Sequence, residues 1–163
     1  MALGHSPSIV RNGLVFYYDM GNPQKSWKGA PTTNLISNPT NEVIATASEF
    51  AVFADLSPIF HTYGEGVYSI SADIKSAVPG GVTVYTASGS VEYNIGYYSA
   101  ACDTYYKRFY FNNINVTRTD PSASISNLSF YGGYGSGIKP SIKNVQVEKN
   151  SFCTPFVAGT RST

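Results

Sequence analysis

The sequence predicts an all-β fold: a two-sheet antiparallel β-sandwich, or jelly roll, with an extended N-terminal arm. The 163 residues include 13 Tyr, 9 Phe, 15 Gly and 9 Pro, a composition that favours pleated strands joined by tight turns. Short segments with a two-residue period recur about every 10 residues, as in sandwiches and barrels. In addition, no capped stripe with a 3.6-residue period is long enough to predict a long helix.

The length of the chain fits a single core, because one domain usually contains about 100–200 residues. Hydrophobic residues make up 42% of the sequence and charged residues 13%. The chain therefore has enough apolar material to bury and too little charge for the disordered class. We expect an extended arm over residues 1–37, a sandwich over 38–156 and a C-terminal tail over 157–163.

The first third of the chain predicts little regular structure. The arm is punctuated by Pro and Gly and contains one apolar run, Gly13–Asp19, which predicts a single strand. Between Glu42 and Phe60 the apolar pattern is mixed. It predicts a strand and a loop, with room for a short helical turn.

A two-residue period becomes clear at Tyr68–Ile74 and predicts a half-buried antiparallel strand. Its apolar face consists of Tyr68, Ile70, Ala72 and Ile74. Pro79–Gly81 is a strong turn signal. The strands Val82–Thr86 and Ser90–Ile95 follow it, and Ser88-Gly89 between them predicts a hairpin.

The remaining strands are short and closely spaced. Lys107–Phe111 and Asn115–Thr117 are strand-like, and Ile125–Tyr131 follows a turn. The Gly-rich loop Gly132–Gly137 interrupts the pattern, and Ile142–Glu148 restores it as a last strand. This loop lacks the Lys-Ser/Thr of a phosphate-binding loop and joins two strands, so we interpret it as a flexible connection.

The charge balance argues against two classes of partner. Eleven basic and ten acidic residues give a formal charge of +1, too little to hold a nucleic acid by counterion release. No apolar run approaches the roughly 20 residues that span a bilayer, and the N-terminus lacks the features of a signal peptide. We expect no nucleic-acid partner, no membrane and synthesis in the cytosol, where disulfides are rare. We therefore interpret Cys102 and Cys153 as two buried free thiols, with one disulfide between them as the alternative.

The residue pattern gives no sign of catalysis. The only histidines, His5 and His61, have no acidic residue or cysteine beside them at the spacing of a triad or a metal site. The carboxylates are scattered and lack a glycosidase motif or a dense run of calcium ligands. We therefore expect a protein that is not an enzyme, with no catalytic residue, no metal and no cofactor.

The last strand carries a resemblance to a known family. Ile142–Phe156, with the sequence IKNVQVEKNSFCTPF, resembles the closing segment of carbohydrate-binding-module-like jelly rolls from tailed-bacteriophage virions, which end in I-x-N-V-Q-L-E-x-x-S-x-A-T-P-F. Cys153 stands where a small Ala is usual. Tyr106–Phe111, YKRFYF, is similar to the W-K-R-Y-x-F strand of the same fold, with Tyr106 in place of Trp.

Both ends of the chain extend this resemblance. Gly13–Asn22 and Ser26–Leu35 resemble an opening phrase of phage tail and fibre proteins, and Thr154–Ser162 resembles the T-P-F-V-x-G-T-R-S that often accompanies it. The resemblance implies a non-catalytic virion structural protein: a capsid decoration, collar, or tail- or fibre-associated subunit. Such a protein is located in the virion and assembled in the host bacterial cytoplasm.

On this reading, the arm and the tail would attach an oligomer of the protein to capsid, neck or tail subunits. The expected interface residues are Leu14, Phe16, Tyr18, Trp27 and Phe156. The alternative is a carbohydrate-binding module that recognises host surface glycans, because sugar rings stack on exposed aromatic rings. Its expected residues are Tyr97, Tyr98, Tyr131 and Tyr134. Packing in the core or on a sheet face, and contact with another protein, are the other roles open to these tyrosines.

Overall fold

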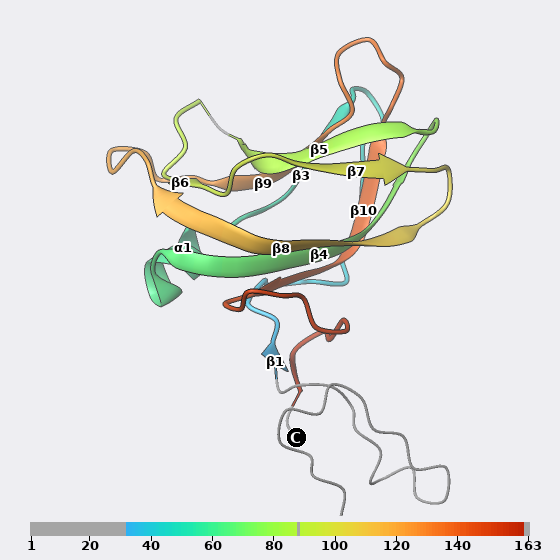
Figure 1. The fold of residues 1–163 in the computed structure, drawn as a ribbon. Helices are drawn as coiled ribbons and strands as arrows, with labels where there is room; N and C mark the ends of the chain where they lie inside the picture. Colours follow the sequence, from blue (N-terminus) through green and yellow to red (C-terminus); the bar gives the residue numbers. More distant parts are fainter. Residues whose placement is uncertain (1–31, 88, 162–163) are drawn as a thin grey trace, which may run out of the picture.

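A computed structural model describes residues 32–87 and 89–161 and forms two antiparallel sheets packed face to face (Figure 1). The predicted all-β sandwich is confirmed. Most of the expected N-terminal arm, including the strand predicted at Gly13–Asp19, lies outside the described residues.

The elements alternate between the two sheets along the chain. They are β1 (Thr32–Thr33), β2 (Val43–Ile44), β3 (Phe50–Asp55), α1 (Ser57–Tyr63), β4 (Gly66–Ser76), β5 (Gly80–Ala87), β6 (Tyr93–Asn94), β7 (Tyr98–Cys102), β8 (Lys107–Arg118), β9 (Asn127–Tyr131), β10 (Pro140–Glu148) and β11 (Thr160–Arg161). The five-stranded sheet has the order β2-β10-β4-β8-β6, and the four-stranded sheet has the order β3-β9-β5-β7. From β2 to β10 each strand lies in the sheet opposite its predecessor, an order compatible with a jelly roll.

The core lies between the two sheets. The predicted apolar face of β4 is confirmed, because Tyr68, Ile70, Ala72 and Ile74 are all buried. They share one hydrophobic cluster with residues of the four-stranded sheet: Val82 and Val84 of β5, and Leu128 and Phe130 of β9. The strict alternation of these side chains fixes which face of each strand points inward.

The predicted hairpin between Val82–Thr86 and Ser90–Ile95 is wrong. Strand β5 pairs with β9 on one edge and β7 on the other, so it has no edge left for β6. Strand β6 instead crosses to the five-stranded sheet and pairs with the end of β8. Tyr93 and Ile95 are buried there, and their burial favours the crossing.

Strand β8 is one continuous strand where the sequence predicts two. Its pairing with β4 shifts between Phe111 and Ile114, which lie opposite Ile70 and Tyr68. Asn113, within the shift, has a φ of 53°. Two residues of β8, Asn112 and Asn113, thus lie opposite the single residue Ser69 of β4. This one extra residue interrupts the alternation that would have marked β8 as a single element.

The short helix α1 confirms the predicted helical turn. Its Pro58 suits the first turn, where a backbone N–H would have no partner in the helix. The Asp55 carboxylate accepts a hydrogen bond from the Ser57 N–H at 2.9 Å. Phe60 is buried and its ring centroid lies 5.1 Å from that of Tyr68, so α1 closes one end of the sandwich. In residues 32–87 and 89–161, no helix has the length and apolar character of a membrane span.

Candidate functional site

The outer faces of the two sheets differ in what lies on them. The terminal segments, residues 32–37 and 149–161, lie on the side of the five-stranded sheet, and β5 and β7 lie on the opposite side of the molecule (Figure 1).

Asn34 ties both terminal segments to β10. Its Nδ2 donates to the Val145 and Val157 carbonyls at 2.9 and 3.0 Å. Its Oδ1 accepts from the Val147 N–H at 3.0 Å, and Asn34 itself is 8% exposed. The backbone of Leu35 adds a further hydrogen bond, from its N–H to the Val147 carbonyl. Residues 34–35 are therefore part of the folded body.

Buried polar side chains hold the C-terminal segment in the same place. The Glu148 carboxylate accepts from the Thr154 N–H at 2.9 Å and the Thr154 hydroxyl at 2.7 Å, and Thr32 donates to it as well. Gln146 Nε2 donates to Thr154 Oγ1 at 3.0 Å, and its Oε1 accepts from the Val157 N–H at 2.7 Å. Glu148, Gln146 and Thr154 are all buried. The Gln, Glu and Thr of the resemblance motif thus have a structural role here.

Phe156 is half-buried against its own sheet. The Arg108 guanidinium lies 5.0 Å from the centre of the Phe156 ring, a cation–π contact. The same guanidinium donates to Asp73 Oδ1 at 3.2 Å and Ser71 Oγ at 2.6 Å. The other expected interface residues, Leu14, Phe16, Tyr18 and Trp27, lie outside the described residues.

The two ends of the described chain leave this side together. Strand β1 pairs with β11, with Thr32 opposite Arg161 and Thr33 opposite Thr160. Figure 1 shows β1 beside the C-terminal segment, on the side of the five-stranded sheet. Any segment that continues from either end starts from this one place.

The opposite side carries four aromatic rings, those of Phe50, Tyr85, Tyr97 and Tyr131. We call these rings, together with the outward-facing residues beside them, the aromatic face. A row of direct cross-strand partners runs over all four strands: Phe50, Tyr131, Thr83 and Ser99. The next row contains Val52, Ser129 and Tyr85. Tyr97, just before β7, stacks on Tyr85 with centroids 5.3 Å apart and planes 24° apart.

The rings of the aromatic face differ in exposure. Tyr97 is 75% exposed and Phe50 37% exposed, whereas Tyr85 and Tyr131 are half-buried. Phe50 and Tyr131 contact edge to face, with centroids 6.4 Å apart. Burial raises the pKa of Tyr85, and the neighbouring hydroxyls of Tyr97 and Tyr131 raise it further. The Tyr85 phenol is therefore neutral at physiological pH.

The structure separates the four tyrosines suggested for glycan binding. Tyr97 and Tyr131 lie on the aromatic face. Tyr134 is 95% exposed but lies in the loop between β9 and β10. Tyr98 pairs with the buried Val84 and its ring packs 5.9 Å from Phe111 of the other sheet. Tyr98 thus belongs to the inner side of the sheet and does not join the exposed rings.

Tyr85 and Phe50 complete the aromatic face and were not among the predicted residues. A signal for Tyr85 is present in the sequence, since Val82 and Val84 alternate inward along β5 and leave Tyr85 on the outer side. Phe50 has no such signal, because a register shift after Val52 disturbs the alternation of β3.

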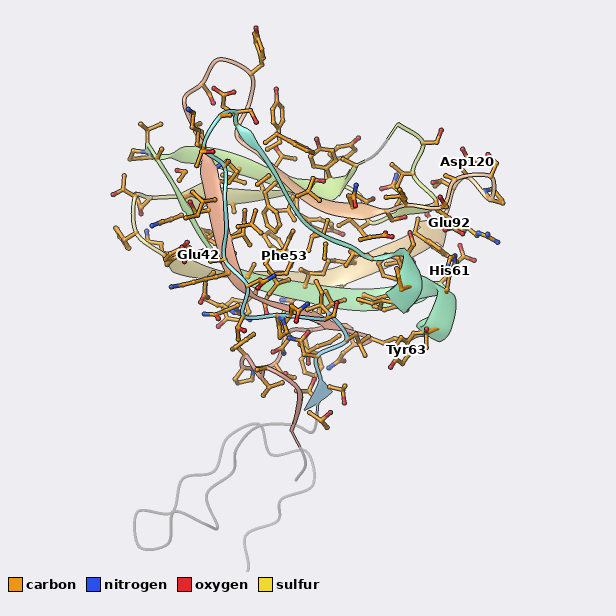
Figure 2. All side chains as sticks on the ribbon, turned by 180° about the vertical axis from the view of Figure 1, so that it is seen from behind. Glu42, Phe53, His61, Tyr63, Glu92 and Asp120 are labelled. Atoms are coloured by element: carbon orange, nitrogen blue, oxygen red, sulfur yellow. The ribbon has the colours of Figure 1, made fainter. Side chains whose placement is uncertain are left out.

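A polar cluster at the α1 end was also missed. His61 Nε2 lies 2.8 Å from Glu92 Oε1, and Arg118 donates to the same oxygen from Nε at 3.0 Å and a terminal nitrogen at 2.7 Å. Figure 2 shows His61 and Glu92 close together at this end of the sandwich. Glu92 is 1% exposed, and its Oε2 has no hydrogen-bond partner. Because 31 residues separate His61 from Glu92, local spacing gives no sign of the contact.

This cluster has the character of an ion-pair network that joins α1 to β8. The hydrogen bond with His61 lowers the pKa of Glu92, burial opposes this, and Arg118 adds to the lowering. A carboxylate held ionised in this way is a poor proton donor. Elsewhere in residues 32–87 and 89–161, no three His, Cys, Asp or Glu side chains gather as a metal site would require. Cys102 and Cys153 are both free, the first buried and the second half-buried.

No protein-family model matches the chain, and a search of curated proteins found no similar sequence. The similarity to phage jelly rolls thus rests on the motifs quoted above.

Proposed function

We propose that the chain is a non-catalytic structural subunit of a tailed-bacteriophage particle, attached to capsid, neck or tail proteins through its terminal segments. The observation that carries this proposal is that residues 32 and 161, the two ends of the described chain, lie together on the same side of the sandwich, where β1 pairs with β11. One neighbouring subunit can therefore bind both ends at once. The opposite side remains available for a second contact.

The buried hydrogen bonds beneath the terminal segments support a role in attachment. Asn34, Gln146 and Glu148 connect these segments to β10, a central strand of its sheet. A pull on either end is thus transmitted into the body through several buried hydrogen bonds. A buried donor or acceptor that loses its hydrogen-bond partner destabilises the fold by about 1–3 kcal/mol.

Deletion of residues 1–31 tests the attachment. This deletion removes Leu14, Phe16, Tyr18 and Trp27 but keeps Asn34 and its contacts with β10. We expect a folded protein, judged by circular dichroism and thermal melting, that no longer enters particles. Tyr134→Ala, which changes an exposed loop residue, serves as a control and should be incorporated normally. Incorporation of the truncated protein at the full copy number would exclude attachment through the N-terminal segment.

A second candidate function is recognition of a host surface glycan, and the Tyr85–Tyr97 pair favours it. A stacked pair with one ring 75% exposed offers a flat apolar surface with polar edges, as binding sites for sugar rings do. Tyr97→Ala should weaken binding to host surface polysaccharide. Unchanged binding would argue against this function.

A further inference from the structure

The aromatic face carries almost no charge. Strands β5, β7 and β9 have the sequences GGVTVYTA, YSAAC and NLSFY, which contain no Asp, Glu, Lys, Arg or His. Strand β3 has one charged residue, Asp55, at its end. Asp55 Oδ1 accepts hydrogen bonds from the Ser57 and Ser126 N–H groups, each at 2.9 Å, so the protein's own backbone orients this one carboxylate.

Among the strands of the two sheets, the charged residues lie mainly on the other sheet. Strands β4, β8 and β10 carry Asp73, Lys75, Lys107, Arg108, Arg118, Lys143 and Glu148. The neutrality of the four-stranded sheet is therefore a local property of its strands. It does not follow from the low charge of the chain alone.

Uncharged hydroxyl groups lie beside the rings. Thr83 pairs with Tyr131 on one side and with Ser99 on the other. Thr83 is half-buried and Ser99 exposed, and both hydroxyls can donate and accept hydrogen bonds. The row over the four strands thus has two rings, Phe50 and Tyr131, followed by two hydroxyls, Thr83 and Ser99. It is about 14 Å wide at the usual strand spacing.

We infer that the ligand of the aromatic face is an uncharged saccharide. This inference rests on the second proposed function and specifies its ligand class. The apolar C–H face of a sugar ring can stack on Tyr97, and sugar hydroxyls can exchange hydrogen bonds with Thr83 and Ser99. An anionic sugar would lose hydration from its carboxylate or sulfate without meeting a cationic partner, which is unfavourable.

Affinity electrophoresis of the full chain tests this inference. The gels would contain a neutral polysaccharide (dextran, laminarin or galactomannan) or an anionic one (polygalacturonate, alginate or heparin). We expect at least one neutral polymer to retard the protein, with equal retardation at low and high salt. The anionic polymers should retard it weakly or not at all.

Three variants locate the binding site. Tyr97→Ala should weaken the retardation by roughly fivefold to tenfold, the equivalent of one aromatic stacking contact. Tyr110→Ala is the matched control, because Tyr110 is 55% exposed but lies on β8 of the other sheet. Thr83→Lys places a cation on the aromatic face and should create binding to anionic polymers that weakens with salt.

The outcomes separate the ligand class from the function itself. Salt-sensitive retardation by anionic polymers only would overturn the uncharged ligand and leave glycan recognition standing. No retardation by any of the polymers would overturn both. Retardation that survives Tyr97→Ala, or that falls equally in Tyr110→Ala, would exclude the aromatic face as the site.

Discussion

Glu92 receives three hydrogen bonds from two other elements on a single oxygen. His61 comes from α1 and Arg118 from β8, while the second carboxylate oxygen is buried without a partner. The lowered pKa of Glu92 means that folding favours its ionised form. Its contribution to stability is therefore present above the ordinary pKa of 4.5 and is lost as the pH falls below that value.

Glu92→Gln should lower the urea midpoint of unfolding at neutral pH, because it removes the charge that Arg118 and His61 face. The difference from the unchanged protein should shrink as the pH falls below 4.5. Urea titrations over a pH series measure this difference. Glu42→Gln, at an exposed carboxylate, is the control and should have little effect at any pH. A difference for Glu92→Gln that does not vary with pH would contradict the ion-pair role.

Gly132 is required by a close backbone approach. A Cβ at this position would lie 1.9 Å from the Ile138 carbonyl oxygen, whereas a Cβ at Gly81 would meet no atom within 4 Å. We expect Gly132→Ala to destabilise the protein by about 1–3 kcal/mol through local overpacking. Gly81→Ala should have almost no effect. Chemical denaturation of both variants provides the comparison, and equal stabilities would show that the loop can move aside.

At the scale of elements, β10 and the C-terminal segment form one unit. Thr154→Val keeps the shape of the side chain but removes the hydroxyl that Glu148 and Gln146 contact. We expect a loss of about 1–3 kcal/mol, because buried polar groups lose a partner, and faster hydrogen exchange at the Val157 amide. Thr33→Val, at an exposed threonine, should change stability by less than about 0.5 kcal/mol. Similar effects of the two substitutions would show that the buried network contributes little.

The sequence predicts the elements better than their partners. Alternation at Tyr68–Ile74 correctly predicts the inner face of β4, since that period is a local property. The partner of β6 is not local in sequence. Strand β6 pairs with Thr117 and Arg118 at the end of β8, and β7, which lies between β6 and β8 in the chain, belongs to the other sheet. A Ser-Gly pair predicts a hairpin only when both strands remain in one sheet, and the burial of Tyr93 and Ile95 prevents this.

At the scale of the whole molecule, the candidate site was only partly predictable. The sequence shows many tyrosines but does not show which of them share a face. Adjacent Tyr97 and Tyr98 are separated by the sheet, with one ring outside and one packed on Phe111. Tyr85 is brought to Tyr97 by the pairing of β5 with β7. This arrangement depends on the register between strands, which the sequence does not specify.

The two sides of the sandwich suggest a division of roles. The charged five-stranded sheet carries the terminal segments, and the four-stranded sheet, whose strands contain Asp55 as their one charged residue, carries the aromatic face. On the proposed function, the first side faces the particle and the second faces outward. Each side can then be changed by mutation without altering the other, as expected for well-separated sites.

Cryo-electron microscopy of the intact particle tests this orientation most directly. Each copy of the chain would be located, and the neighbours of β1 and β11 compared with those of Tyr85 and Tyr97. We predict that the terminal segments contact capsid, neck or tail subunits and that the aromatic face points to solvent. Copies held through the aromatic face with both termini free, or particles that lack the protein, would contradict the proposed role.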